Sequence, residues 1–274
     1  MKQLYTIQKV HKIFETGGSS PLLVTCNDYN EWVCKYDKFS NYLFNELIAS
    51  EFAKIWDINV PDTALIKVDK EHVPFEKYTS LQPYYFDKEC FGSLYIKETM
   101  EVNLSLIPLF KEKSFINKIS NKEDFLKIAF FDIWLANEDR SHNNFNLLIK
   151  FDENNIKFFY AIDHVNILNT SSALNYGIAE LTEEETIINT ELAKILFSRI
   201  RGLPLIVESL VEKMYLCTIN CQNKIDEIFS LVPDSWLIDK EDYKEKIITN
   251  IFSDTWKKSC ENNFRSFIQS FIVN

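Results

Sequence analysis

The polar stretch at residues 137–144 holds the side chains best suited to chemistry. It contains Asp139 and Asn144, five positions apart, and Asp163 follows after a predicted hairpin. Phosphoryl transfer from ATP uses such a set, because one Asp orients the attacking hydroxyl and accepts its proton while an Asn and a second Asp hold magnesium ions on the phosphates. The alternative is a solvated loop whose Asp and Asn side chains only make turns and helix caps.

Two upstream residues favour phosphoryl transfer. Lys35 lies in a predicted strand that follows a Gly-Ser loop and an apolar run, and Glu46 lies on the next predicted helix. Kinases pair such a lysine with such a glutamate to fix the nucleotide phosphates. The order and spacing of these residues match that use.

Short β-favouring runs bounded by turn residues predict two hairpins and one further strand. The runs are residues 22–26 with 31–36, residues 145–150 with 157–162, and residues 64–68. Lys35 is therefore expected near the end of a strand, and Asp163 directly after one.

Helices are predicted from apolar side chains at helical spacing. One covers residues 41–56, with Ser40 or Asn41 as its cap. Ser120 and Glu123 form a capping box that opens a second helix, which ends just before the polar stretch.

The last third of the chain is predicted to be helical. The pattern begins at Thr182, capped by Glu185, and runs almost to the C-terminus with breaks at Pro204 and Pro233. The first third mixes strand and helix patterns. The chain has no internal repeat, and no linker marks a boundary between its first and last thirds.

Composition limits the classes of function. The chain has 274 residues and a net charge of -10, enough length for one large core or two packed lobes. Nucleic-acid binders gather positive charge, so the acidic balance argues against direct nucleic-acid binding, and also against docking on an anionic membrane. Neither a spanning segment nor a cleavable leader is recognisable, which predicts a cytoplasmic protein.

Cysteine, aromatic and histidine residues each leave an alternative open. The six scattered cysteines are expected to be reduced thiols, with a redox pair at Cys217 and Cys221 as the alternative. The 14% aromatic content is expected to pack in the core rather than form a base-stacking surface. Near His142 and His164, oxygen-ligated magnesium is expected rather than zinc.

Four motifs together resemble a known family. They are Asn-Glu-Asp-Arg-Ser-His-Asn-Asn-Phe-Asn-Leu-Leu at 137–148, Ala-Ile-Asp-His at 161–164, Gly-Gly-Ser at 17–19 and Asn-Glu at 45–46. This set resembles the HipA-like kinases, especially the compact bacterial branch that consists of little more than the kinase domain. Phosphoinositide lipid kinases look similar around the Asp-Arg stretch alone.

The resemblance implies an α+β, two-lobed, protein-kinase-like fold. Residues 1–100 would form a small N-terminal nucleotide-binding lobe with an antiparallel sheet and one helix, and residues 101–274 a larger, mostly helical catalytic lobe. It also implies an ATP- and magnesium-dependent serine/threonine kinase with a protein substrate, self-phosphorylation at Ser19 or Ser20, and an antitoxin-type partner. The alternatives are a catalytically silent module that binds nucleotide or a partner, and a small-molecule or lipid kinase. A stand-alone kinase is the alternative to a kinase with an antitoxin-type partner.

The resemblance also assigns a role to each candidate residue. The catalytic base is Asp139, the magnesium ligands are Asn144 and Asp163, the phosphate-contacting lysine and its partner are Lys35 and Glu46, and the loop that covers the phosphates is Gly17, Gly18, Ser19 and Ser20. That loop does not follow the GxGxxG pattern. Arg140 is either an internal counterion or a surface arginine, and Ser141 before His142 leaves the role of His142 open.

Overall fold

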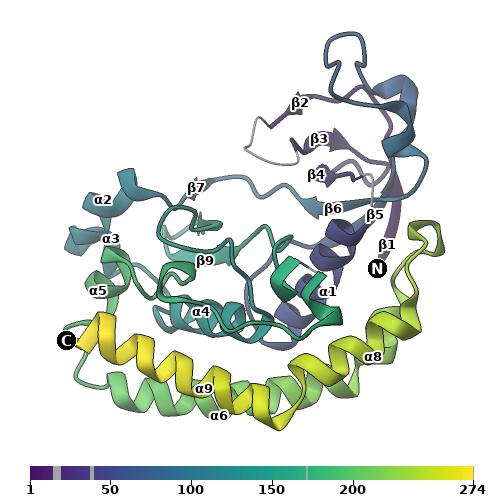
Figure 1. The fold of residues 1–274 in the computed structure, drawn as a ribbon. Helices are drawn as coiled ribbons and strands as arrows, with labels where there is room; N and C mark the ends of the chain where they lie inside the picture. Colours follow the sequence, from purple (N-terminus) through teal and green to yellow (C-terminus); the bar gives the residue numbers. More distant parts are fainter. Residues whose placement is uncertain (15–19, 38–39, 171, 274) are drawn as a thin grey trace.

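The N-terminal part of the molecule is built on a six-stranded sheet. The computed structural model describes residues 1–14, 20–37, 40–170 and 172–273. The strands are β1 (Lys2–Tyr5), β2 (Lys12–Ile13), β3 (Leu22–Thr25), β4 (Glu31–Lys35), β5 (Thr63–Lys67) and β6 (Cys90–Leu94). Their order is β1-β5-β6-β4-β3-β2, and neighbours are antiparallel except for β1 with β5 (Figure 1). The predicted hairpin is confirmed as β3 and β4, and the predicted single strand as β5.

Helix α1 (Asn41–Ile55) confirms the helix predicted after β4, and ten of its fifteen residues are buried. The predicted cap position is confirmed at Ser40, but the expected capping hydrogen bond is absent. Ser40 has φ 66° rather than the extended backbone of a side-chain cap, and its hydroxyl accepts from Lys88 instead. Burial of the apolar face therefore stabilises α1 in place of a side-chain cap.

A second, three-stranded antiparallel sheet has the order β7-β8-β9. Its strands are β7 (Thr99–Glu101), β8 (Leu147–Phe151) and β9 (Lys157–Ala161). The pair β8 and β9 confirms the second predicted hairpin, whereas β7 was not predicted. The chain passes from β6 in the first sheet to β7 in the second, so this short segment joins the two parts (Figure 1).

Helix α4 (Glu123–Leu135) precedes the polar stretch, and eleven of its thirteen residues are buried. The predicted capping box is wrong, because the N–H of Ser120 donates to the carbonyl of Lys157 at 2.9 Å and ties Ser120 to β9. Asn121 Oδ1 instead accepts from the N–H of Glu123 at 3.2 Å. A helix buried on nearly all sides is a core helix, so α4 is a rigid support for the residues that follow it.

The helices after Thr182 confirm the helical C-terminal third. They are α5 (Glu191–Phe197), α6 (Leu203–Asn223), α7 (Ile225–Ser230), α8 (Lys240–Ile251) and α9 (Asp254–Ile268), followed by a π-helical turn at Gln269–Val273. Two short helices, α2 (Ile107–Lys111) and α3 (Lys113–Ile116), lie earlier, between β7 and α4. The capping box of Thr182 and Glu185 is present, but it opens only the 3₁₀ turn Glu183–Glu185. Pro204 lies in the first turn of α6, where a missing N–H costs nothing.

Aromatic side chains fill the core. Of the twelve largest fully buried side chains, eleven are Phe or Trp and the twelfth is Arg140. Helix α4 packs against α6 and α9, where the rings of Phe130 and Phe264 stack with centroids 4.1 Å apart. The expectation of aromatic core packing is confirmed.

All six cysteine thiols are free and five are buried. Within the described ranges, no helix combines the length and the apolar character needed to cross a bilayer.

Candidate active site

One large cavity gathers the residues that the sequence singled out. Its volume is about 1400 Å³, and its walls come from both parts of the molecule. They include Lys35 at the end of β4, Glu46 on α1, and Asp139, Asn144 and Asp163 around the second sheet. Five polar residues that lie far apart in the sequence therefore face a common space.

The loop expected to cover the phosphates is described only at its end. Gly17, Gly18 and Ser19 lie outside the described residues. Ser20 lines the large cavity, has φ 45°, and accepts a hydrogen bond at its carbonyl from the Tyr36 hydroxyl at 3.2 Å. The loop thus rejoins β3 at the wall of the cavity.

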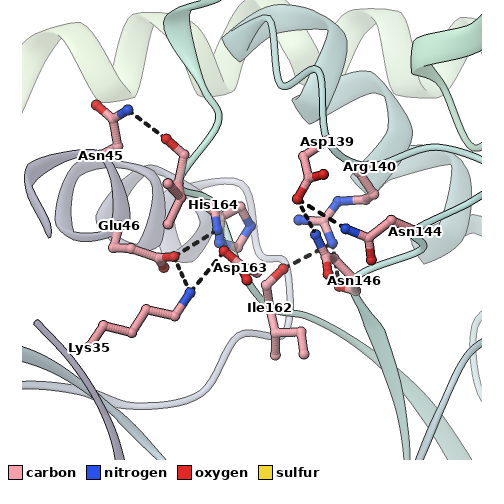
Figure 2. Close-up of polar contacts among 11 residues, drawn as sticks. Lys35, Asn45, Glu46, Asp139, Arg140, Asn144, Asn146, Ile162, Asp163 and His164 are labelled. Atoms are coloured by element: carbon pink, nitrogen blue, oxygen red, sulfur yellow. Dashed lines mark hydrogen bonds and ion pairs between the residues drawn. The ribbon is translucent and has the colours of Figure 1, made fainter. Parts of the chain in front are cut away.

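Lys35 lies between two carboxylates (Figure 2). Its Nζ forms an ion pair with Glu46 and lies 2.8 Å from Asp163 Oδ1. Lys35 and Glu46 are buried, whereas the Asp163 side chain is 39% exposed. Burial by itself would lower the pKa of Lys35, but the two carboxylates outweigh it and raise that pKa above its ordinary value. Lys35 therefore keeps its positive charge at neutral pH.

The two carboxylates titrate in different ranges. Burial raises the pKa of Glu46 to about 7, although Lys35 opposes this shift. At Asp163 burial also favours the neutral form, but Lys35 overcomes it and holds the pKa at about 2. Asp163 is therefore ionised at neutral pH and presents its charge to the cavity.

Helix α1 also fixes the backbone around Asp163. Asn45 Nδ2 donates to the carbonyl of Val165 at 2.7 Å, and Glu46 Oε1 accepts from the N–H of His164 at 3.1 Å (Figure 2). Asp163 itself has φ 57°, a left-handed conformation that Asp adopts more readily than most residues. The adjacent pair Asn45 and Glu46 thus secures the strand end from which Asp163 projects.

Asp139 is oriented by two amides. The chain leaves α4 through Ala136 at φ 49°, and Asp139 Oδ2 then accepts from Asn144 Nδ2 and Asn146 Nδ2, each at 3.0 Å (Figure 2). Among the residues that the structure describes, none donates a hydrogen bond to Asp139 Oδ1. Because both amides bind one oxygen, the other oxygen is left to accept a proton from a bound hydroxyl.

Arg140 is fully buried directly after the candidate base. Its Nε lies 2.8 Å from Asp132 Oδ2 on α4. Its Nη1 donates to the carbonyls of Ile162 at 3.2 Å and Asn146 (Figure 2). The same Nη1 also donates to the carbonyl of Phe145 at 3.3 Å. The interpretation as an internal counterion is confirmed, and the interpretation as a surface arginine is wrong.

The contacts of Arg140 connect three candidate site residues. Two of its carbonyl partners, Phe145 and Asn146, directly follow Asn144. The third, Ile162, directly precedes Asp163, and Arg140 itself follows Asp139. Burial raises the pKa of Asp132 to about 6, although Arg140 opposes this shift. The guanidinium of Arg140 therefore connects the residues directly before β8 and directly after β9 to helix α4.

The donor chemistry of the cavity fits magnesium. Asp163 offers carboxylate oxygens, and Asn144 offers its amide oxygen because its NH₂ group is bound to Asp139. Magnesium in kinase sites is bound by one or two carboxylates together with substrate phosphates and waters. In the described ranges, no three His, Cys, Asp or Glu side chains gather in a way that would hold a metal by themselves. Asp163 and Asn144 therefore suit an ion that is shared with a nucleotide.

Sequence reasoning missed Asn146 and Asp132. Asn146 belongs to the quoted motif, but its position directly before β8 gave no sign that its amide binds Asp139. Asp132 carried a readable signal, because it is a lone acid within an apolar helical run and a buried acid needs a cation or hydrogen-bond donors.

Comparisons with known proteins identify the fold and the family. Among solved structures, CtkA, a proinflammatory kinase from Helicobacter pylori, matches with a TM-score of 0.56 and 16% identity, over 97% of this chain and 98% of its own. HipA of Shewanella oneidensis MR-1, solved with HipB and operator DNA, matches with a TM-score of 0.47 and 11% identity, over 95% of this chain and 66% of its own. The curated proteins contain no match. The fold is the predicted α+β, two-lobed, kinase-like one. The family model for HipA-like kinases matches residues 7–268, and the chain belongs to the HipA-like kinase family.

Proposed function

We propose that the chain is an ATP- and magnesium-dependent kinase that transfers the γ-phosphate to a serine or threonine hydroxyl of a protein. The observation that carries the proposal is the single cavity in which Lys35, Asp163 and Asp139 meet. Family membership supports the transfer of phosphate from ATP. A protein substrate is the partner that the proposal requires, and an antitoxin-type partner stays a prediction from the family resemblance.

In the proposed reaction, each residue acts through its position and charge. Lys35 contacts the phosphates of ATP and is itself held by Glu46. The acceptor hydroxyl approaches Asp139 Oδ1, which takes its proton as the oxygen attacks the γ-phosphorus. The new P–O bond forms while the bond to the β–γ bridging oxygen breaks, and ADP leaves. A magnesium ion on Asp163 and Asn144 would neutralise charge on the phosphates.

Asp139→Asn tests the proposed base. We expect kcat for phosphoryl transfer to fall by about 10²- to 10⁴-fold, because an amide does not accept the hydroxyl proton. Asn can still accept the hydrogen bonds of Asn144 and Asn146, so the Tm and the affinity for ATP should stay at wild-type values. The assay uses ATP labelled in its γ-phosphate, Mg²⁺ and a protein extract, followed by phosphoamino-acid analysis.

The outcomes of that assay separate the alternatives. Labelled phosphoserine or phosphothreonine that disappears in the Asp139→Asn variant supports the proposal. Label found only in lipids or small molecules would reassign the acceptor. Nucleotide binding without transfer would indicate a silent binding module, and wild-type activity in the variant would contradict the role of Asp139.

We also propose that the enzyme phosphorylates Ser19 or Ser20 on itself. Ser20 lines the cavity that Asp139 also lines, so a hydroxyl of this loop lies near the proposed site of transfer. After incubation with MgATP, peptide mapping by mass spectrometry is expected to find one added phosphate within residues 17–20. Ser80 lines the same cavity, so the mapping also covers Ser80, and phosphate found there but not within residues 17–20 would contradict the choice of this loop. Unmodified serines in residues 17–20 of an active enzyme would contradict this proposal.

A further inference from the structure

A second cavity is lined by the same loop as the proposed active site. Its volume is about 210 Å³. Within residues 139–145, Asp139 and Asn144 line the large cavity, whereas His142 and Phe145 line the small one. The same loop therefore separates the proposed base from a second binding space, and His142 belongs to that second space.

The small cavity is lined by both apolar and acidic side chains. Leu104, Ile107 and Phe145 provide its apolar surface, and Glu184 and Glu191 provide its carboxylates. An apolar cavity of about 150 Å³ can hold a benzene molecule, so this space accommodates one long side chain. None of the described residues that line it is a lysine or an arginine.

Both carboxylates can exchange their present contacts for a new cation. Glu184 Oε2 lies 3.7 Å from His142 Nδ1, which is longer than a hydrogen bond, and its side chain is 77% exposed. Glu191 pairs with Lys111 at 2.7 Å, but both side chains are more than half exposed. Such surface pairs contribute little free energy, so a cation from a bound substrate can replace Lys111.

We propose that this cavity binds a lysine or arginine side chain of the protein substrate, close in sequence to the acceptor hydroxyl. The apolar side would contact the methylene stem, and the carboxylates of Glu184 and Glu191 the charged end. A substrate chain with its hydroxyl at Asp139 brings neighbouring residues past His142, because one loop lines both cavities. The net charge of -10 also favours a basic substrate segment. This inference rests on the proposed function.

Peptide kinetics test the inference. The probes are serine peptides that carry a single lysine at successive positions on either side of the serine, with norleucine in place of lysine as the neutral reference. We expect a lower KM for lysine at one or two positions only. The Glu184→Gln/Glu191→Gln variant should raise the KM of those peptides about fivefold, with kcat and the KM for ATP unchanged. Glu212→Gln, an exposed site on α6 that lines neither cavity, is the matched control.

A charge reversal sharpens the test. Glu184→Lys should reverse the preference, so that a glutamate at the same peptide position lowers KM. A preference that is independent of lysine position, or that survives in the Glu184→Gln/Glu191→Gln variant, would overturn the inference while the proposed function stands. A folded enzyme that transfers phosphate from MgATP to no peptide and no protein would overturn the proposed function itself, and the inference with it.

Discussion

Replacing Asp163 with Asn is expected to lower the rate of phosphoryl transfer by about 10²- to 10³-fold or more while the chain stays folded. The substitution removes the charge that faces the cavity, and an amide is a poor ligand for magnesium. Asn adopts the left-handed φ of 57° as readily as Asp does, and its oxygen can still accept a hydrogen bond from Lys35. Glu46 remains as the ion-pair partner of Lys35. The measurements are kcat with saturating MgATP and the Tm of the purified variant.

Asp152→Asn is the matched control for this experiment. Asp152 lies in the turn between β8 and β9, where its Oδ1 accepts from the N–H groups of Asn154 at 2.9 Å and Ile156 at 2.6 Å. An Asn at this position keeps the same acceptor, so activity and Tm should both be retained. An Asp163→Asn enzyme that is folded and as active as the Asp152→Asn control would contradict the assignment of Asp163.

Arg140→Met is expected to lower the free energy of unfolding by about 3 to 5 kcal/mol. The substitution leaves Asp132 buried without its cation, and it removes the donor that binds the carbonyls of Phe145, Asn146 and Ile162. The apolar volume of the side chain is largely kept, so the loss reports charge and hydrogen bonding more than packing. Urea unfolding measures the effect, and Arg201→Met at an exposed position is the control with little expected change.

The loss in Arg140→Met should depend on pH through Asp132. Burial already raises the pKa of Asp132 from its ordinary value of 3.8 to about 6, and the guanidinium that opposes this shift is absent in the variant. Between the unfolded and folded pKa values, the folded variant holds a proton that the unfolded chain has released. From about pH 4 to about pH 6 stability falls with rising pH in both proteins, because Asp132 holds a proton in the folded state of each. Above about pH 6 the folded wild type has released this proton and the folded variant, with its higher pKa, still holds it, so the deficit relative to wild type grows as pH rises above 6.

Adding Asp132→Asn to Arg140→Met should recover part of the lost stability and remove its pH dependence. The neutral amide can be buried at a lower cost than a carboxylate, and it can still accept from Asn137 Nδ2, which now donates to Asp132 Oδ1 at 2.8 Å. An equal loss at both ends of the pH range, with no recovery in the double variant, would contradict the ion pair as the source of the effect.

The elements that could be predicted are those whose sequence pattern is local. The elements that were not predicted depend on partners far away in the sequence. The hairpins β3–β4 and β8–β9 were predicted because turn residues separate adjacent β-favouring runs. Strand β1 pairs in parallel with β5, where Lys2 lies opposite Ala64, and the four residues of β1 do not indicate that partner. Strand β6 contains Gly92, where a Cβ would lie 2.3 Å from Ile66 Cδ1, so the need for glycine comes from the neighbouring strand. The positions of β1 and β6 are therefore determined by long-range packing, which the local sequence pattern does not contain.

The candidate site shows the same division. The polar stretch and the strand before Asp163 are continuous segments, so the residue types and their order were readable from the sequence. The pairing of Lys35 with Glu46 was expected from their order and spacing in the sequence. That Asp163 joins this pair depends on how α1 lies against the segment after β9, where Glu46 accepts from the N–H of His164. The burial of Arg140 depends on Asp132, and spacing alone left the surface alternative open.

Calorimetric titration with ATP tests the central claim most directly, with and without Mg²⁺, on the wild-type chain and on Asp163→Asn. The account predicts binding that requires Mg²⁺ in the wild type and is lost or greatly weakened in the variant, since Asp163 supplies the only charged side chain among the proposed magnesium ligands. Equal binding of ATP by both proteins, unaffected by Mg²⁺, would contradict the proposed magnesium site and with it the assignment of this cavity.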